Sequence, residues 1–265
     1  MRLPFVKMEG AGNDYVFVDA IAQPFPQSRG SELARRWSDR HFGIGGDGLI
    51  VLARGADGGI AMQMWNADGS RGAMCGNGLR CLARLAYELG HVRERSFVVA
   101  TDAGPRRVEI AGDAVRTEMG AVHVAEHPES LELGGVAVQV WRGDAGNPHA
   151  VIFCDPEAAP VERIGAAAQV HPAFPGGVNV EFVAVAGTDR LRQRTFERGS
   201  GETLACGTGA AVAALAACRQ GRLPGPRVAV ALRGGVLHVD LGRTPLVIEG
   251  PARTVFRGEI DLPDA

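Results

Sequence analysis

Lysine is almost missing from this chain, since Lys7 is the only one among its 265 residues. An enzyme that uses pyridoxal phosphate binds the cofactor as a Schiff base to a lysine, and here only Lys7 is available for that bond. The Gly-Lys-Ser/Thr sequence of a phosphate-binding P-loop is also absent. The sequence therefore disfavours both pyridoxal chemistry and a P-loop nucleotide site.

Long apolar runs and an excess of either charge are missing as well. No stretch approaches the roughly 20 apolar residues of a membrane span, and the opening MRLPFVKMEG has no continuous apolar segment like that of a signal peptide. The net charge is −2 and the arginines are scattered, unlike the basic patch of a protein that binds nucleic acid or an anionic membrane. We expect a cytoplasmic protein that acts on a small molecule, with no nucleic-acid or membrane partner.

Cysteine is sparse, with five residues at positions 75, 81, 154, 206 and 218. No two of them have the Cys-x-x-Cys spacing of a zinc site, and their density is too low for a disulfide scaffold. Free thiols and no metal site are expected.

The glycines at 43, 45 and 48, in GIGGDG, match the dinucleotide-binding pattern G-x-G-x-x-G. That pattern binds a nucleotide only when a strand precedes it and a helix follows it. Here residues 31–42 are helix-like before the glycines, and residues 49–53, LIVLA, are strand-like after them. Because the order is reversed, the sequence disfavours a nucleotide site.

An internal repeat is centred on two cysteines. The sequence CGNG begins at Cys75 and CGTG begins at Cys206. Each cysteine lies 15 residues before a glycine, Gly90 or Gly221, that ends an apolar segment. Repetition of the whole segment indicates two related halves rather than a chance match.

The repeat extends upstream of the cysteines. Asn66 and Glu197 each lie nine residues before their cysteine, and the Ala-Gly-Asn that ends at Asn13 recurs at Asn147, 134 residues later. Two halves of similar plan are therefore expected along the chain.

Each cysteine is expected at the start of a helix. Apolar residues recur at helical spacing from Leu79 to Leu89, while residues 210–218 are apolar on every side and predict a buried helix. Short alternating or apolar runs elsewhere, such as residues 179–185, predict strands. The expected fold is α/β of the α+β type, with two pseudo-symmetric domains, each a mostly antiparallel sheet wrapped around a central helix.

A thiol at a helix start faces unpaired N–H groups and the positive end of the helix dipole, which favour the thiolate by about 0.3–2 kcal/mol. The neighbouring glycines let a ligand carboxylate approach the same N–H groups. Two such sites facing each other across an interdomain cleft would place one cysteine on either side of the Cα of a bound amino acid. That arrangement predicts racemisation.

Other interpretations of these residues stay open at this point. Cys81, Cys154 and Cys218 fall within helices or strands and are expected to be core residues. Cys75 and Cys206 also fit a disulfide or a thiol redox switch. Asparagine and histidine also occur commonly in turns, which is the alternative for Asn13, Asn66, Asn77, Asn147, Asn179 and His149.

Motifs spread from residue 8 to residue 210 carry a resemblance to a known family: MEGAGNDYVFVD, GIGGDGLI, MWNADGSRGAMCGNGLRC, GNPHAV, NVEF and FERGSGETLACGTGA. In these the chain resembles the diaminopimelate epimerases over nearly its whole length. The resemblance implies a pyridoxal-independent isomerase that interconverts LL- and meso-diaminopimelate in lysine and peptidoglycan precursor biosynthesis. It also implies a homodimer, no cofactor, and two domains, residues 1–118 with about 252–265 and residues 119–251.

The same resemblance implies roles for individual residues. Cys75 and Cys206 would be the catalytic acid–base pair, and His149 and Glu197 would tune their pKa values. The substrate diaminopimelate would be bound by Asn13, Asn66, Gly76, Asn77, Asn147, Asn179, Glu197, Arg198, Gly207 and Thr208. No metal ligand is implied.

Some positions depart from the family pattern. Gly48 stands where some members carry a glutamine that touches substrate, so a backbone or water contact would have to serve there. Proline and hydroxyproline racemases, which share the fold, carry a histidine where this chain has Asn77. An epimerase acting on another amino acid, such as histidine, and a non-enzymatic thiol redox protein remain the alternatives.

Overall fold

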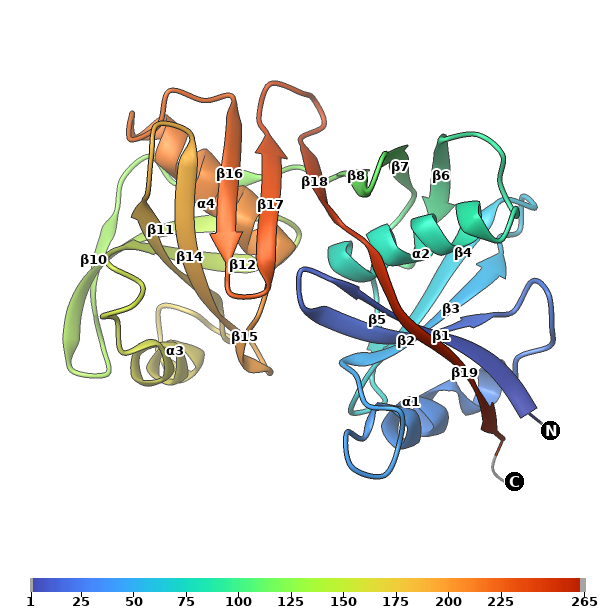
Figure 1. Ribbon diagram of the computed structural model, residues 1–265. Helices are drawn as coiled ribbons and strands as arrows, with labels where there is room; N and C mark the ends of the chain where they lie inside the picture. Colours follow the sequence, from blue (N-terminus) through green and yellow to red (C-terminus); the bar gives the residue numbers. More distant parts are fainter. Residues whose placement is uncertain (1, 263–265) are drawn as a thin grey trace. The chain divides into compact units, whose positions relative to one another are not determined.

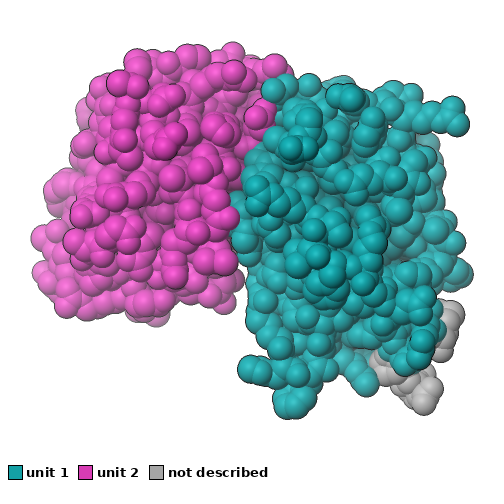
Figure 2. Space-filling view, in the orientation of Figure 1, with its two compact units in different colours: residues 1–117, 250–265 teal, residues 118–249 magenta. Residues whose placement is uncertain are grey.

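The computed structural model describes residues 2–262, which form a mixed α/β fold with many strands and few helices (Figure 1). This confirms the α/β class expected from the sequence. The chain divides into two compact units, and Figure 2 colours them separately. Unit 1 comprises residues 1–117 and 250–265, and unit 2 comprises residues 118–249. None of the helices within residues 2–262 combines the length and the apolar character that crossing a membrane requires.

Unit 1 is built on a sheet whose strands follow the order β19-β1-β2-β3-β4-β6-β7-β8, with the short β5 paired to β4. The pairs β2–β3 and β4–β6 are parallel, and the others are antiparallel. Its elements are β1 (Arg2–Gly10), β2 (Asn13–Asp19), the 3-10 helix η1 (Gln27–Arg29), α1 (Gly30–Ser38), β3 (Gly48–Arg54), β4 (Ile60–Asn66), β5 (Arg71–Gly72), α2 (Gly76–Glu88), β6 (Ser96–Ala100), β7 (Arg106–Ala111), β8 (Ala114–Glu118) and β19 (Arg253–Asp261).

Unit 2 has a sheet of the order β10-β11-β12-β13-β14-β16-β17-β18, with the short β9 on β11 and β15 on β14. Here β12–β13 and β14–β16 are the parallel pairs. Its elements are β9 (His123–Val124), β10 (Glu129–Leu133), β11 (Val136–Asp144), β12 (Pro148–Phe153), α3 (Val161–Val170), β13 (Asn179–Val185), β14 (Arg190–Glu197), β15 (Gly201–Thr203), α4 (Gly207–Arg219), β16 (Arg227–Leu232), β17 (Gly235–Asp240) and β18 (Val247–Pro251), which reaches into unit 1.

The two units repeat one plan. In each, an outer helix, α1 or α3, connects the first parallel pair, and a central helix, α2 or α4, connects the second. Such agreement in element order and strand direction extends the sequence repeat to the whole unit. The repeat pairs three site positions across the units. Asn13 begins β2 and Asn147 directly precedes β12, Gly48 and Asn179 begin β3 and β13, and Asn66 and Glu197 end β4 and β14.

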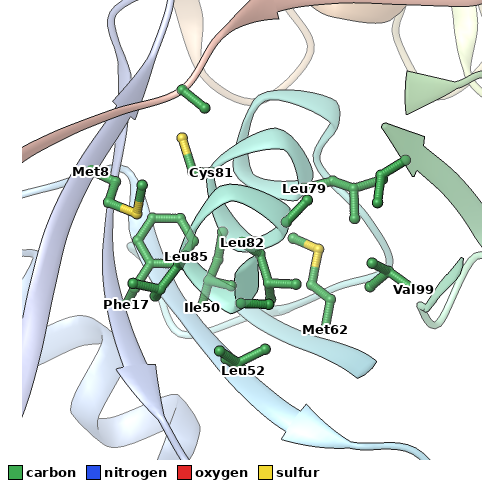
Figure 3. Close-up of a cluster of buried hydrophobic side chains, with 14 of the residues drawn as sticks. Met8, Phe17, Ile50, Leu52, Met62, Leu79, Cys81, Leu82, Leu85 and Val99 are labelled. Carbon is green, nitrogen blue, oxygen red and sulfur yellow. The ribbon is translucent and has the colours of Figure 1, made fainter. Parts of the chain in front are cut away.

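The sheet of unit 1 is covered on both faces. Alternate side chains of a strand point to opposite faces, so Phe17 and Ile50 pack with α2 while Val16 and Leu49 pack with α1. Figure 3 shows the cluster around α2, in which Cys81 is buried. Burial raises the pKa of Cys81 to about 12, so this thiol is a core residue, as expected.

The central helix of unit 2 is buried almost all round, which is what its apolar sequence predicts. It consists largely of alanine, so its backbone packs close to the strands. A Cβ on Gly143 of β11 would lie 2.2 Å from Cγ1 of Val212, which shows how closely the two elements approach. Cys154 and Cys218 are only half-buried, so they lie at the margin of the core and not inside it.

Candidate active site

Cys75 and Cys206 occupy the same structural position, the N-cap of the central helix of their unit. Both have extended backbone, and the sulfur of each accepts a hydrogen bond from the N–H of the third following residue, at 3.5 Å from Gly78 and 3.4 Å from Gly209. The sulfurs therefore lie over the first helical turn, at the positive end of the helix dipole.

The second glycine of each CGxG motif is required by close packing. A Cβ on Gly78 would lie 2.4 Å from Cδ1 of Ile50, and one on Gly209 would lie 2.4 Å from Oε1 of Glu181. Ile50 and Glu181 are the third residues of β3 and β13, so the two contacts are equivalent. A Cβ on Gly76, by contrast, would meet nothing within 4 Å, which leaves this helix start open to a ligand.

In unit 1 the half-buried Cys75 faces an amide. Its thiol donates to Oδ1 of Asn13 at 3.2 Å, and Nδ2 of Asn77 donates to the same oxygen at 3.3 Å. Asn77 is buried, and its own Oδ1 accepts from the buried guanidinium of Arg80 at 2.6 Å. Burial, followed by the neighbouring Cys75, raises the pKa of the Tyr15 hydroxyl well above its usual value. Tyr15 therefore stays protonated beside the sulfur.

In unit 2 Cys206 faces acidic side chains. It is 4% exposed, and its sulfur lies 3.4 Å from Oγ1 of Thr208. Burial, then the charges of Glu197 and Glu181, raises its pKa well above the ordinary value. Burial also raises the pKa of Glu197, whose Oε1 accepts from Oγ1 of Thr203 at 2.5 Å. The helix dipole was expected to favour the thiolate, but burial and the two carboxylates have the larger effect at this cysteine and raise its pKa.

His149 belongs to a buried pair beneath the start of α4. Its Nδ1 lies 2.8 Å from Oε1 of Glu181, and its Nε2 lies 3.0 Å from Oδ1 of Asn147. Both ring nitrogens of His149 therefore lie within hydrogen-bond distance of an oxygen atom. Among the residues that the structure describes, Oε2 of Glu181 has no hydrogen-bond partner.

In unit 2, Asn179 begins β13 and Arg198 follows the end of the neighbouring β14, and in unit 1 Asn66 ends β4. Asn179 is buried, where Nδ2 donates to Pro148 O at 3.2 Å and Oδ1 accepts from the Arg198 N–H at 2.9 Å. The side chain of Arg198 is exposed. Asn66 donates through Nδ2 to Oγ of Ser70 at 2.9 Å, which closes the turn after β4. These three residues therefore have visible turn or anchoring contacts in addition to any contact with substrate.

Gly48 has no room for a side chain in this chain. A Cβ there would lie 2.2 Å from the backbone oxygen of Trp65 and 3.0 Å from Cε1 of Tyr15. The sequence suggested only that a glutamine contact is absent. The packing adds that β3 and β4 would have to separate before a side chain at this position fitted.

Several residues at the two cysteines were not singled out from the sequence. All four lie inside the motifs quoted above, close to the residues that the sequence marks by the repeat or the resemblance: Tyr15, Asp47, Glu181 and Thr203. The repeat offers a signal for Tyr15, which stands two residues after Asn13 as His149 stands two after Asn147. Within residues 2–262 no group of three or more His, Cys, Asp or Glu is placed to hold a metal ion.

Comparisons with known proteins agree over nearly the whole chain. A family model described as diaminopimelate epimerase matches residues 5–125 and 143–255. The chain is 39% identical over 286 aligned residues to a diaminopimelate epimerase of Leptospira biflexa serovar Patoc, covering 99% of this chain and 100% of that protein. It is 42% identical to one of Heliobacterium modesticaldum, covering 98% and 100%.

Solved structures resemble the fold at low sequence identity. A phenazine biosynthesis protein of the PhzF family from Bacillus anthracis superposes with a TM-score of 0.76 at 15% identity, covering 99% of this chain and all of that chain. A hydroxyproline epimerase from Agrobacterium vitis superposes with a TM-score of 0.71 at 18% identity, covering 99% and 93%. At these identities the likeness shows the fold alone.

Proposed function

Because the chain belongs to the diaminopimelate epimerase family, we propose that it is an isomerase that interconverts LL- and meso-diaminopimelate by proton transfer at one α-carbon. The observation that carries the mechanism is the equivalence of Cys75 and Cys206. Two thiols at the N-caps of repeated helices, each beside a glycine-lined first turn, provide two acid–base groups and two carboxylate-binding helix starts.

The proposed reaction needs one thiolate and one thiol. The thiolate removes the α-proton from one face of the carbon, and the thiol delivers its own proton to the opposite face, so the two cysteines exchange protonation states in each turnover. The chemistry requires each thiol to reach its own face of the bound α-carbon. Since burial and nearby carboxylates raise the pKa of Cys206, its thiolate would form when the ammonium groups of the substrate offset those carboxylates.

The negative charge that develops on the substrate would be stabilised by the backbone. N–H groups in the first turn of a helix have no acceptor within that helix. We assign those of Gly76, Asn77, Gly207 and Thr208 to the reacting carboxylate, where they favour the carbanion electrostatically. Metal and pyridoxal phosphate are not needed for this step.

The remaining polar residues would select a substrate with a second charged end. The exposed guanidinium of Arg198 is suited to bind the distal carboxylate by paired hydrogen bonds. Asn13, Asn66, Asn147, Asn179 and Glu197 supply amide and carboxylate groups for the ammonium and carboxylate groups of diaminopimelate. We assign the tuning of Cys206 acidity to His149 and Glu197: the charge of Glu197 raises the pKa of this thiol, and His149 acts through Glu181, whose Oε1 lies 2.8 Å from its Nδ1.

We also propose a cytoplasmic homodimer that serves lysine and peptidoglycan precursor synthesis. Support for the dimer comes from β19, a strand of nine residues that pairs with β1 in the described part of the chain. Val255 and Phe256 on this strand are 55% and 45% exposed, which is typical of a surface that a second copy covers.

Incubation of the protein with LL-diaminopimelate in D₂O, under reducing conditions and without pyridoxal phosphate, tests the function. We expect deuterium at one α-carbon and appearance of the meso form. Exchange with histidine or hydroxyproline, and none with diaminopimelate, would point to an epimerase of the same fold with another substrate. Absence of exchange with all three amino acids would contradict the proposed function and favour the alternative of a non-enzymatic thiol redox protein.

A further inference from the structure

The two residues assigned to pKa control, His149 and Glu197, both lie in unit 2. Unit 1 carries different residues at the matching positions, since Tyr15 stands where unit 2 has His149 and Asn66 stands where it has Glu197. Cys75 therefore needs another group to set its protonation state and orientation. The contacts around Asn13 identify one.

Asp47 lies at the end of the glycine-rich loop between α1 and β3, and three N–H donors converge on its carboxylate. Oδ2 accepts from Nδ2 of Asn13 at 2.5 Å and from the Asp14 N–H at 3.0 Å, and Oδ1 accepts from Nη2 of Arg40 at 3.0 Å. Burial and the neighbouring Asp14 carboxylate raise the pKa of Asp47, whereas the donors on both oxygens oppose that shift and favour the ionised carboxylate. A carboxylate accepts but cannot donate, so Asn13 must turn its NH₂ toward Asp47 and its oxygen away.

We infer that Asp47 is a positioning residue for Cys75: it orients the Asn13 amide so that the amide oxygen accepts the thiol proton. The distances agree, since the same Oδ1 accepts from the sulfur of Cys75 at 3.2 Å and from Nδ2 of Asn77 at 3.3 Å. Without Asp47 the amide is free to reverse and present NH₂ to the sulfur, which favours the thiolate. As far as catalysis is concerned, the inference rests on the proposed role of Cys75.

The loop that carries Asp47 is held on both sides. The Asp47 N–H donates to Asp14 O at 2.7 Å, and Asp47 O accepts from Ala67 N–H at 3.1 Å. A Cβ on Gly46 would lie 2.9 Å from Nζ of the buried Lys7, and that ammonium is itself paired with Oδ2 of Asp14 at 2.6 Å. The glycines of GIGGDG therefore let the loop pass close to Lys7 and deliver Asp47 to Asn13.

Charges around this network come from four elements. Asp14 belongs to β2, Lys7 to β1, Arg40 to the loop after α1, and Arg80 to α2. Arg40 pairs with both acids, at 2.7 Å from Asp14 and 3.0 Å from Asp47. Tyr15, protonated beside the sulfur, and the buried Cys81 also couple electrostatically to Cys75. Of these groups, Asp47 is the one bonded to the amide that contacts the thiol.

Site-resolved alkylation tests the inference without substrate. Iodoacetamide labelling of each cysteine, followed by peptide mass spectrometry across a pH series, compares the wild type with Asp47→Asn and Asn13→Ala and their combination. Asp102→Asn is the matched control, since Asp102 is a half-exposed acid of the same unit paired with Arg71. Cys206 in the same samples is the internal reference.

In Asp47→Asn we expect the labelling midpoint of Cys75 to fall by about one pH unit, with that of Cys206 and of the control variant unchanged. Asn13→Ala should lower it similarly, because the thiol loses its acceptor. In the double variant the two effects should not add, because Asp47 acts through Asn13. An unchanged midpoint in either single variant, or fully additive shifts, overturns the inference. Should Asp47→Asn fail to fold, Asp47→Ser takes its place, with the same fall of the Cys75 midpoint and the same lack of additivity with Asn13→Ala expected.

Epimerase activity distinguishes this inference from the proposed function. If wild-type protein exchanges the α-proton of diaminopimelate but the alkylation midpoints do not move, only the role of Asp47 is wrong. If the midpoints move as expected in a protein that shows no exchange, the positioning contact stands and the function fails. In an active enzyme, Asp47→Asn should lower kcat/KM by about 10- to 100-fold, the range for loss of one charged hydrogen bond.

Discussion

Cys75 and Cys206 cap equivalent helices in two copies of one structural plan, but different side chains surround them. Beneath Cys206 lie the ionisable His149 and Glu181, and the matching positions in unit 1 are Tyr15 and Ile50. Cys206 is buried among carboxylates, whereas Cys75 is half-buried against an amide. The repeat therefore conserves the backbone features, a helix start and an anion site, while the charge control of each thiol is built separately.

The strongest test of this comparison removes each thiol in turn. We expect Cys75→Ala and Cys206→Ala each to lower the epimerisation rate by about 10³-fold or more, because each direction of the reaction needs both an acid and a base. Conversion of LL- to meso-diaminopimelate, measured by chiral chromatography, checks this. Substantial activity in either variant would show that the two sites are not partners. Cys218→Ala, at the margin of the core, is the control.

The second largest effect is expected when the buried acid Glu181 of unit 2 is replaced by an apolar residue. The loss of stability should then differ from that of a substitution at the equivalent position of unit 1. Glu181→Leu leaves Nδ1 of the buried His149 without its hydrogen-bond partner, and we expect the free energy of unfolding to fall by about 2–3 kcal/mol. Ile50→Leu, at the equivalent position of unit 1, should cost less than about 1.5 kcal/mol. Chemical denaturation measures both. Equal losses would mean that the His149–Glu181 pair contributes nothing specific.

The starts of β3 and β13 offer a steric version of the comparison. Gly48→Asn copies Asn179 into unit 1, where its Cβ would meet the Trp65 backbone oxygen at 2.2 Å. Overpacking against backbone should destabilise the protein by about 1–3 kcal/mol, seen as a lower melting temperature. Gly58→Asn, in a turn at φ +79° with open space around it, should cost less than about 1 kcal/mol, because asparagine is among the few residues that adopt left-handed backbone. A neutral Gly48→Asn would contradict the packing argument.

Removal of one charge near Cys206 should have the smallest effect. Its pKa is raised by burial and then by Glu197, so Glu197→Gln should move the alkylation midpoint of Cys206 to lower pH by about one unit and leave Cys75 unchanged. Since the folded pKa lies above the unfolded one, the stability this thiol contributes is present below its unfolded pKa and declines as the pH rises through the folded value. An unshifted midpoint would remove Glu197 from the control of Cys206.

Much of the fold could be predicted because its signals are local. The apolar periodicity after Cys75 and the all-apolar segment after Ala210 indicate α2 and α4, and both form. Residues 49–53 and 179–185 alternate or run apolar, and both lie within strands. The pairing of distant strands, such as β1 with β19, has no local signal, because it depends on contacts between the two ends of the chain.

The sequence could predict those residues of the site that stand at positions of the internal repeat. The cysteines and the asparagines stand at repeated positions, and periodicity identifies a helix start without any three-dimensional information. Asp47 and Glu181 could not be assigned in this way, because each acts on a residue more than 30 positions away, Asn13 or His149.

By itself the sequence determined that two cysteines begin two repeated helices, because capping and apolar periodicity depend on neighbouring residues. Only the tertiary structure decided what each thiol faces. A side chain at the end of one strand contacts whatever the neighbouring strand and loop bring to it, and in this protein they bring an amide held by Asp47 to Cys75. To Cys206 they bring two carboxylates, that of the buried Glu181 and that of the half-buried Glu197.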